Sequence, residues 1–140
     1  MSEIYSVDVK ITAPVYETEV PDRVADAITN LFPGAELDHQ HGEIVGETHD
    51  LSHFSELLHR REILDTARGA FFENRQGDTF SFDLKKQAAF QEVANFAVGD
   101  PDELGEIHVR VRVTEPDVET FIDHIAPPTR DGQPVETDDR

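Results

Sequence analysis

Two segments of this chain alternate between apolar and polar residues with a period of two. They run from Ser6 to Tyr16 and from Ile107 to Val113, and in both valine or another apolar residue fills every second position. The positions between are polar, and they include Lys10, Arg110 and Arg112. This period predicts strands with one buried and one open face, in an antiparallel or mixed sheet that helices cover on one side only. The three cations are therefore expected on the open face.

Three further segments carry weaker strand signals. Thr79 to Leu84 alternates, with two phenylalanines and a leucine facing inward, and it follows a turn at Gln76–Asp78. We also predict strands at Glu43 to Thr48, after a turn at His41–Gly42, and at Glu92 to Val98. These segments complete the expected sheet.

Helical spacing of apolar residues predicts two simple helices. The first spans Pro21 to Leu31, where proline suits the first turn and a following Pro-Gly pair ends the helix. The last spans Val118 to Ile125, and we expect Thr114 and Asp117 to form a capping box before it. Lys85 to Gln91 is expected to be a short helical turn or loop.

The residues from 51 to 74 resemble one long helix, but their apolar pattern changes phase. The apolar arcs of the two halves are rotated by about 130° from each other, so a single straight helix cannot bury both against one surface. We therefore predict two helices, Leu51 to His59 and Glu62 to Asn74. The bend falls at Arg60 and Arg61, whose side chains are expected to point outward.

The composition is strongly acidic. The chain has 30 acidic and 12 basic residues in 140, a formal net charge of −18, and more arginine than lysine. Dense carboxylates without one acidic block indicate adaptation to a salt-rich cytoplasm, such as that of a halophilic archaeon, because salt screens their mutual repulsion. The average field repels phosphate, so any nucleic-acid site must be local.

The organisation expected is a single α+β domain. It spans residues 1–128, and residues 129–140 form a turn followed by an acidic tail. The chain has no cysteine, which excludes disulfides, thiolate zinc sites and a cysteine nucleophile. No signal peptide or membrane-length apolar run is found, so we expect a soluble cytoplasmic protein that does not bind a membrane.

Seven histidines raise the question of a metal site. His39 and His41 are two residues apart, and His49 and His53 are four apart near a helix start. No acid at a defined spacing completes a ligand set, so surface histidines are favoured and no metal or other cofactor is predicted. No phosphate-binding loop, dinucleotide-binding glycine pattern or nucleophile elbow is present, so no enzyme activity is predicted.

Half of the basic residues gather between residues 60 and 90. Six basic and five acidic side chains give this stretch a formal charge of +1, while the rest of the chain carries −19. Arginine binds phosphate with two hydrogen bonds, and lysine adds a point charge. A glutamine in the stretch offers an amide to a base edge or a ribose. The predicted RNA-contacting residues are Arg61, Arg68, Arg75, Lys85, Lys86 and Gln87.

Each basic group also has an ordinary explanation. Asp65 stands three residues before Arg68, so a local ion pair on one helical face accounts for both. The residue pattern leaves the ligand-site and structural interpretations open. Lys10, Arg110 and Arg112 are either ordinary solvated strand residues or a second basic surface for RNA or a partner subunit.

Several motifs of the chain resemble an archaeal family of uncharacterised proteins, number 0201. They occur in the family's order and cover nearly the whole chain. Members are classed as RNA-binding proteins, and their fold is similar to that of ribosomal protein L-five, an α+β fold with helices on one side of a sheet. The motifs are VDVKITAPVYETEVPDRVADAI (residues 7–28), LFPGA (31–35), ILDTAR (63–68), KQAAF (86–90), LGEIHVRV (104–111) and IAPPTRDGQPV (125–135).

The resemblance assigns only a few residues. Its two signatures match Asp65, Thr66 and Arg68, and Lys86, Gln87 and Ala88, with Asp65 and Thr66 in a supporting role. The chain departs from the family pattern at Lys85, where asparagine is frequent, and at His124, where an aromatic residue is common. The first departure adds charge to the predicted site, and the second removes an aromatic group suited to stacking.

The function that these observations favour is RNA binding through a local basic patch. The alternative is a structural or interaction module, such as a homodimer, whose basic residues pair with its own acids. A third hypothesis is an enzyme acting on an RNA or nucleotide, for which no catalytic group is identified.

Overall fold

Eight strands and five helices make up the part of the chain described by the computed structural model, which covers residues 5–97, 105–130 and 133–134. The helices are α1 (Pro21–Leu31), α2 (Ser52–Arg60), α3 (Leu64–Glu73), α4 (Lys86–Ala89) and α5 (Val118–Ile125). The strands are β1 (Ser6–Pro14), β2 (Glu36–Gln40), β3 (Glu43–Thr48), β4 (Arg75–Gln76), β5 (Thr79–Lys85), β6 (Glu106–Glu115), β7 (Thr129–Arg130) and β8 (Gln133–Pro134).

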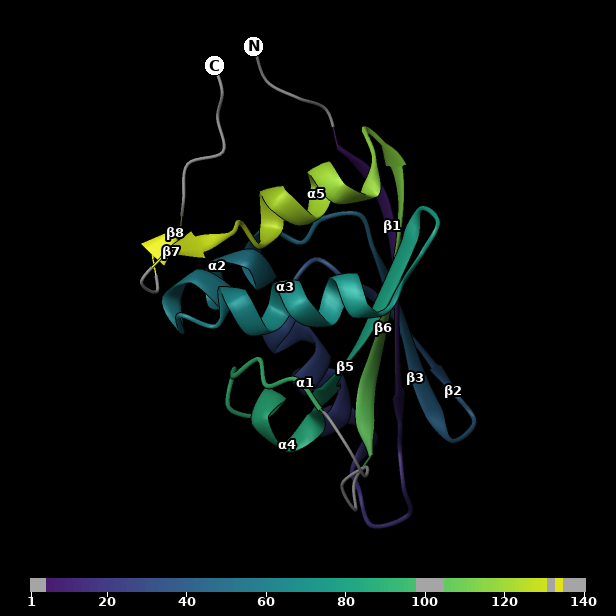
Figure 1. Cartoon of the computed structure of the whole chain (residues 1–140). Helices are drawn as coiled ribbons and strands as arrows, with labels where there is room; N and C mark the ends of the chain where they lie inside the picture. The colour runs from purple at the N-terminus through teal and green to yellow at the C-terminus, as the bar shows by residue number, and fades with distance from the viewer. Residues whose placement is uncertain (1–4, 98–104, 131–132, 135–140) are drawn as a thin grey trace.

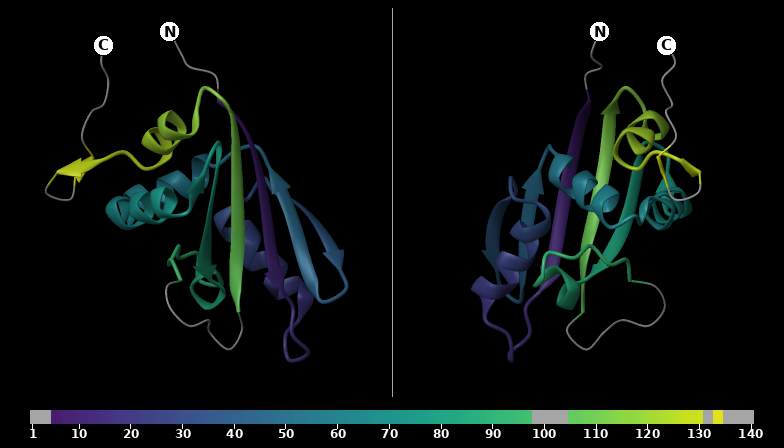
Figure 2. Two further views of the ribbon diagram at one scale, coloured as in Figure 1. Left: turned by 45° about the vertical axis from the view of Figure 1, so that its right-hand side comes forward. Right: turned by 90° about the vertical axis from the view of Figure 1, so that its left-hand side faces the viewer.

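Six of these strands form one antiparallel sheet. Their order is β2-β3-β1-β6-β5-β4, so the two strands with the clearest alternation, β1 and β6, pair at its centre. The helices lie together on one side of the sheet (Figure 1). Seen from that side, they pass in front of the strands (Figure 2). The predicted α+β class, with helices on one face, is confirmed.

Burial follows the alternation of the sequence. In β1, β5 and β6 every second side chain is buried and the side chains between them are not. The buried side chains meet the apolar faces of the helices, where aromatic rings pack closely. The ring of Phe71 on α3 lies 4.9 Å from those of both Phe80 and Phe82 on β5, measured between centroids. One layer of apolar side chains thus joins the sheet to the helices.

The predicted bend between two helices is confirmed. α2 ends at Arg60 and α3 begins at Leu64, and between them Glu62 has a φ of 56°, in the left-handed region. The backbone N–H of Ile63 donates to the carbonyl of Leu58 and closes the turn. Arg60 and Arg61 are exposed at this joint, as the change in apolar phase predicts.

The predicted strand from Glu92 to Val98 is wrong. Glu92 has a φ of 59°, which interrupts an extended backbone, and Val98 lies outside the described residues. Only an isolated bridge at Phe96 follows β5, supported by backbone hydrogen bonds that join Lys85 to Asn95 and Ala97 to Asp83. The segment covers the edge of β5 without continuing the sheet.

The predicted capping box is also wrong. β6 continues through Thr114 to Glu115, so Thr114 belongs to the strand. Asp117 itself is the N-cap of α5, where its carboxylate accepts a hydrogen bond from the backbone N–H of Thr120 at 2.8 Å. The predicted helix from Val118 to Ile125 is present, but its N-cap is Asp117, three residues after Thr114.

Part of the predicted organisation stays a prediction. β7 and β8 pair as a small hairpin, but residues 131–132 of the expected turn and residues 135–140 of the expected acidic tail lie outside the described residues. Within the described part of the chain, none of the helices combines the length and the apolarity needed to cross a membrane.

The cap of α5 predicts a pH effect on stability. The backbone N–H of Thr120, and then its hydroxyl, donate to Asp117 and lower the pKa of that carboxyl below its ordinary value. The folded-state pKa is therefore below the unfolded one, so this stabilisation is present above about pH 4 and is lost as the pH falls through the folded-state pKa. Asp117→Asn keeps a capping oxygen but does not titrate. Its melting temperature should fall less than that of the unmodified protein below about pH 4, and parallel curves would contradict the assignment.

Candidate nucleic-acid interface

The basic residues predicted to bind RNA do not form one surface. Arg61 lies at the joint before α3, and Arg75 lies after its other end, in β4. A helix of ten residues is about 15 Å long, so α3 holds these two arginines well apart. Lys85 and Gln87 lie at the far end of β5 and in α4. The stretch from 60 to 90 is continuous in sequence but not in space.

Lys86 is completely buried, which contradicts its assignment as a phosphate contact. Its Nζ donates to the carbonyl of Pro14 at 2.6 Å and to the Glu19 carboxylate at 2.9 and 3.3 Å. The same ammonium lies 5.2 Å from the centroid of the Tyr16 ring. Lys86 therefore attaches α4 to the segment between β1 and α1, and it is not accessible to RNA in this fold.

Arg68 pairs with a residue distant in sequence. Its Nη1 lies 2.6 Å from the carboxylate of Asp123 and 3.1 Å from the carbonyl of Ala126, so it joins α3 to α5. Its guanidinium also lies 5.0 Å from the centroid of the Phe72 ring. The predicted local pair with Asp65 is wrong, because Asp65 instead accepts a hydrogen bond from the hydroxyl of Thr129.

The remaining residues predicted to bind RNA differ in their contacts within the fold. Arg75 pairs with Glu119 at 2.7 Å, which connects β4 to α5. Arg61, Lys85 and Gln87 form no side-chain hydrogen bond or ion pair with any other described residue. Their role in RNA binding stays a prediction, as does the supporting role of Thr66, which is exposed on α3.

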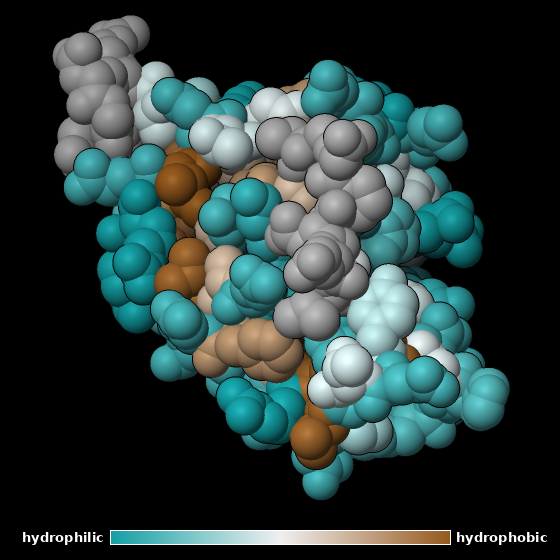
Figure 3. Space-filling model, turned by 90° about the horizontal axis from the view of Figure 1, so that it is seen from below, coloured by the Kyte–Doolittle hydropathy of each residue, from teal (hydrophilic) through white to brown (hydrophobic). Residues whose placement is uncertain are grey.

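The end of the molecule around α4 offers a different kind of surface. The two exposed large apolar side chains of the described residues are Tyr16 and Val20, with 44% and 58% of their area accessible. Seen from below, apolar side chains reach the surface in a broken strip among hydrophilic ones (Figure 3). A phosphate backbone gains little from such a surface, although Lys85 and Gln87 lie near it.

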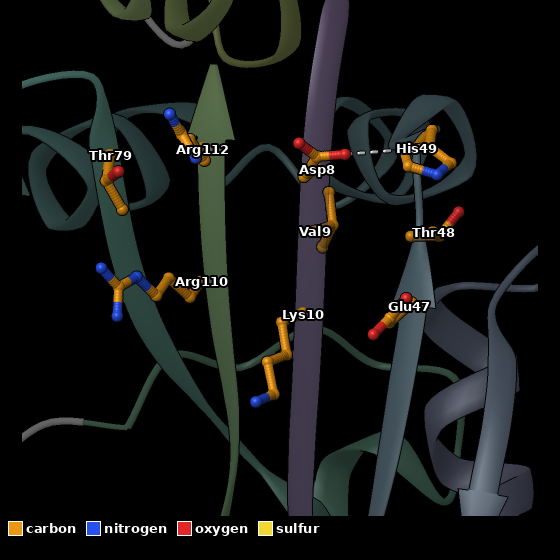
Figure 4. A pocket seen from close by; sticks show the side chains of 9 residues that line it. All are labelled: Asp8, Val9, Lys10, Glu47, Thr48, His49, Thr79, Arg110 and Arg112. Atoms are coloured by element: carbon orange, nitrogen blue, oxygen red, sulfur yellow. Dashed lines mark ion pairs between the residues drawn. The ribbon is translucent and has the colours of Figure 1, made fainter. Parts of the chain in front are cut away.

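The open face of the sheet brings three cations together at its centre. Lys10 on β1 stands directly opposite Arg110 on β6, and Arg112 follows two residues later on the same face. Directly opposite residues have Cβ atoms about 5 Å apart. Figure 4 shows these side chains over the strands, and a shallow hollow of about 450 Å³ lies among them.

Two of these cations are free to meet an external anion. Arg112 has a distant contact with Asp78 at 3.8 Å, and the neighbouring Asp8 is paired with His49 at 3.2 Å. Lys10 and Arg110 are exposed, and no described carboxylate lies within 4 Å of either. Neither of them therefore forms an ion pair with a described residue.

The two halves of the open face differ in charge. On one side of the cations, the outward positions of β5 and β4 are mostly uncharged: Thr79 is opposite Arg112, Ser81 is opposite Arg110, and Gln76 is opposite Thr79. On the other side, β2 and β3 are acidic, and Glu47 is opposite Lys10. The outward acids of these two strands are Glu36, Asp38, Glu43 and Glu47.

The chemistry of this face suits phosphate better than stacked bases or metal ions. Among the described residues, the imidazole of His108 is the only aromatic ring at an outward position of β1, β5 or β6, so bases have little aromatic surface on which to stack there. No group of three or more metal-binding side chains is present among the described residues. The groups on this face that can bind a ligand are therefore arginine and lysine, together with uncharged neighbours that form hydrogen bonds.

Comparison with known proteins places these strands within one family. Residues 8–113, which run from β1 into β6, match a family model described as RNA binding. A UPF0200/UPF0201 protein of Archaeoglobus fulgidus is 37% identical over 136 residues, covering 96% of this chain and 42% of that protein. A UPF0201 protein of Pyrococcus abyssi is 35% identical over 136 residues, covering 92% of this chain and 96% of that protein.

A solved structure shows the same fold. The crystal structure of a UPF0201 protein from Methanococcus jannaschii has a TM-score of 0.86 and 34% sequence identity. The match covers 92% of this chain and 99% of that one.

The buried pair of Lys86 and Glu19 predicts a large effect on stability. Glu19→Gln leaves the ammonium of Lys86 buried without a counter-charge and should lower the free energy of unfolding by about 3–5 kcal/mol. The matched control is Glu119→Gln, which breaks the partly exposed pair with Arg75 and should cost less than about 1 kcal/mol. Denaturant unfolding measures both values, and equal effects would contradict the role of Lys86.

Arg68 should likewise behave as a structural residue. Arg68→Ala removes the contacts with Asp123 and Ala126 and should lower the free energy of unfolding by about 1.5 kcal/mol, near the low end for a charged hydrogen bond because the site is partly exposed. Affinity for RNA should not change at a temperature where the variant is folded. Unchanged stability together with weaker RNA binding would return Arg68 to the candidate site.

Proposed function

Because this chain belongs to the UPF0201 family and matches an RNA-binding family model, we propose that it binds RNA on the open face of its sheet. The observation that carries this proposal is the pair of exposed cations, Lys10 and Arg110, which face each other across β1 and β6 without a partner among the described residues. Arg112 extends the pair along the same strand. Three of the six residues predicted to bind RNA form contacts within the fold. In the proposed site, Lys10, Arg110 and Arg112 replace them.

The contacts expected are to phosphate. A guanidinium donates two parallel hydrogen bonds to phosphate oxygens, and the lysine ammonium adds charge beside it. Such contacts position the RNA without reading its sequence. Because the whole chain has a net charge of −18, phosphate is attracted only near this patch, and the attraction should weaken as salt rises.

A second candidate function follows from the charge division of the same face. Glu47 and its neighbours on β2 and β3 make one half acidic, while Lys10 and Arg110 make the other half basic. Two copies related by a two-fold axis place the acidic half of one against the basic half of the other. The interaction module is therefore a homodimer through the open face, and such a dimer competes with RNA for the same cations.

The salt dependence of RNA binding tests the proposal. The double variant Lys10→Ala/Arg110→Ala removes two phosphate contacts. For a single-stranded RNA oligonucleotide, the slope of log affinity against log salt should fall by about 1.4, from about 0.7 per contact. Fluorescence anisotropy over a potassium chloride series measures this slope.

The matched control removes the same charge from the other side of the molecule. Arg60→Ala/Arg61→Ala deletes two exposed arginines at the joint between α2 and α3, in the helical layer. Its salt slope should equal that of the unmodified protein. A reduced slope in this control, with none in the open-face variant, would place the site at the joint. An unmodified protein that binds no RNA at any salt and sediments as a dimer would favour the second candidate.

A further inference from the structure

A second hollow adjoins the basic patch at the edge of the sheet. It measures about 370 Å³ and lies over β4, β5 and β6. Arg110 lines both this hollow and the one at the centre of the open face. Among the residues that line it, Asn74, Gln76, Ser81, His108 and Arg110 offer hydrogen-bonding groups, and Glu73 adds a carboxylate.

Most of these groups have hydrogen-bonding capacity left over. The amide of Gln76 and the hydroxyl of Ser81 form no hydrogen bond with any other described residue. Asn74 donates through Nδ2 to the carbonyl of Ala70 at 3.0 Å, which leaves its own oxygen as an acceptor. His108 uses Nδ1 toward Asp83 at 2.7 Å, which leaves Nε2 available. Donors and acceptors therefore meet around one small space beside an unpaired guanidinium.

The charges around the patch direct a bound strand toward this hollow. Beyond Lys10, the next residue across the sheet is Glu47, and β2 adds further acids. Further along β5 and β6, the outward positions hold the acids Asp83 and Glu106, with His108 opposite Asp83 and Lys85 opposite Glu106. Between the cations of β6 and strand β4, the outward residues are the uncharged Thr79 and Ser81. A phosphate held at Arg110 thus places the adjoining nucleotide over the hollow.

We propose that this hollow holds one unstacked base of the bound RNA, an inference that rests on the function proposed above. The amide of Gln76 presents a donor and an acceptor side by side, which matches a base edge that carries an acceptor next to a donor. Ser81 supplies a hydroxyl to the same base or to its ribose. Since the imidazole of His108 is the only outward aromatic ring of β1, β5 and β6 among the described residues, hydrogen bonding at this hollow largely replaces the stacking by which many RNA-binding sheets hold bases.

The test separates contacts to a base from contacts to phosphate. Gln76→Ala and Ser81→Ala are each compared with Gln91→Ala, which removes an exposed amide in the turn after α4, outside the hollow. Two probes are used: a single-stranded RNA oligonucleotide, and an abasic oligonucleotide of the same length. Loss of a neutral hydrogen bond should weaken RNA binding by about three- to tenfold. The salt slope and the affinity for the abasic probe should stay unchanged.

The outcomes distinguish this inference from the function on which it rests. If Gln76→Ala and Ser81→Ala bind RNA as the unmodified protein does, or weaken both probes equally, the base site is overturned. In that case a lower salt slope in Lys10→Ala/Arg110→Ala still supports RNA binding at the open face. If the unmodified protein binds neither probe at any salt, the proposed function fails, and the base site fails with it. An equal loss of RNA affinity in Gln91→Ala also contradicts the base site.

Discussion

The one-sided burial of the sheet is the constraint on which the rest of this structure depends. Because successive side chains of a strand point to opposite faces, placing every valine of β1 and β6 against the helices places every residue between them in solvent. The pairing register then decides which outward residues become neighbours. Lys10 meets Arg110 only because β1 and β6 pair antiparallel in this register, and a one-residue shift of either strand would turn the cations of that strand toward the core.

A second consequence concerns what positive charge does in a very acidic chain. Some cations stabilise the fold: Lys86 lies buried beside Glu19, while Arg68 and Arg75 attach α3 and β4 to α5. Others form no ion pair with a described residue, and on the sheet these are Lys10, Arg110 and Lys85. The stretch from 60 to 90 therefore holds structural cations together with free ones, whereas Lys10 and Arg110 come from separate strands. The proposed phosphate binding depends on the free cations.

The sequence predicts the main elements because their signals are local. Alternation identifies the buried face of each central strand, and the change in apolar phase identifies the bend at Arg60. β2 has no such signal, since it is an edge strand with hardly any buried side chain and is recognised only by its pairing with β3. The sequence does not indicate the partners of the cations either, because Lys86 and Glu19 are 67 residues apart, and Arg68 and Asp123 are 55 apart. The role proposed for Gln76 in binding a base depends on the strands beside it, which the local sequence does not specify.

The central claim is that the open face, and not the helical layer, meets RNA. Backbone amide chemical shifts, followed by solution NMR while a single-stranded RNA oligonucleotide is added, test it most directly because they report every surface at once. The largest changes should fall on Lys10, Ser81 and Arg110, with none at Arg60 or Arg61. Changes centred on the joint between α2 and α3, with β1 and β6 unaffected, would contradict the claim.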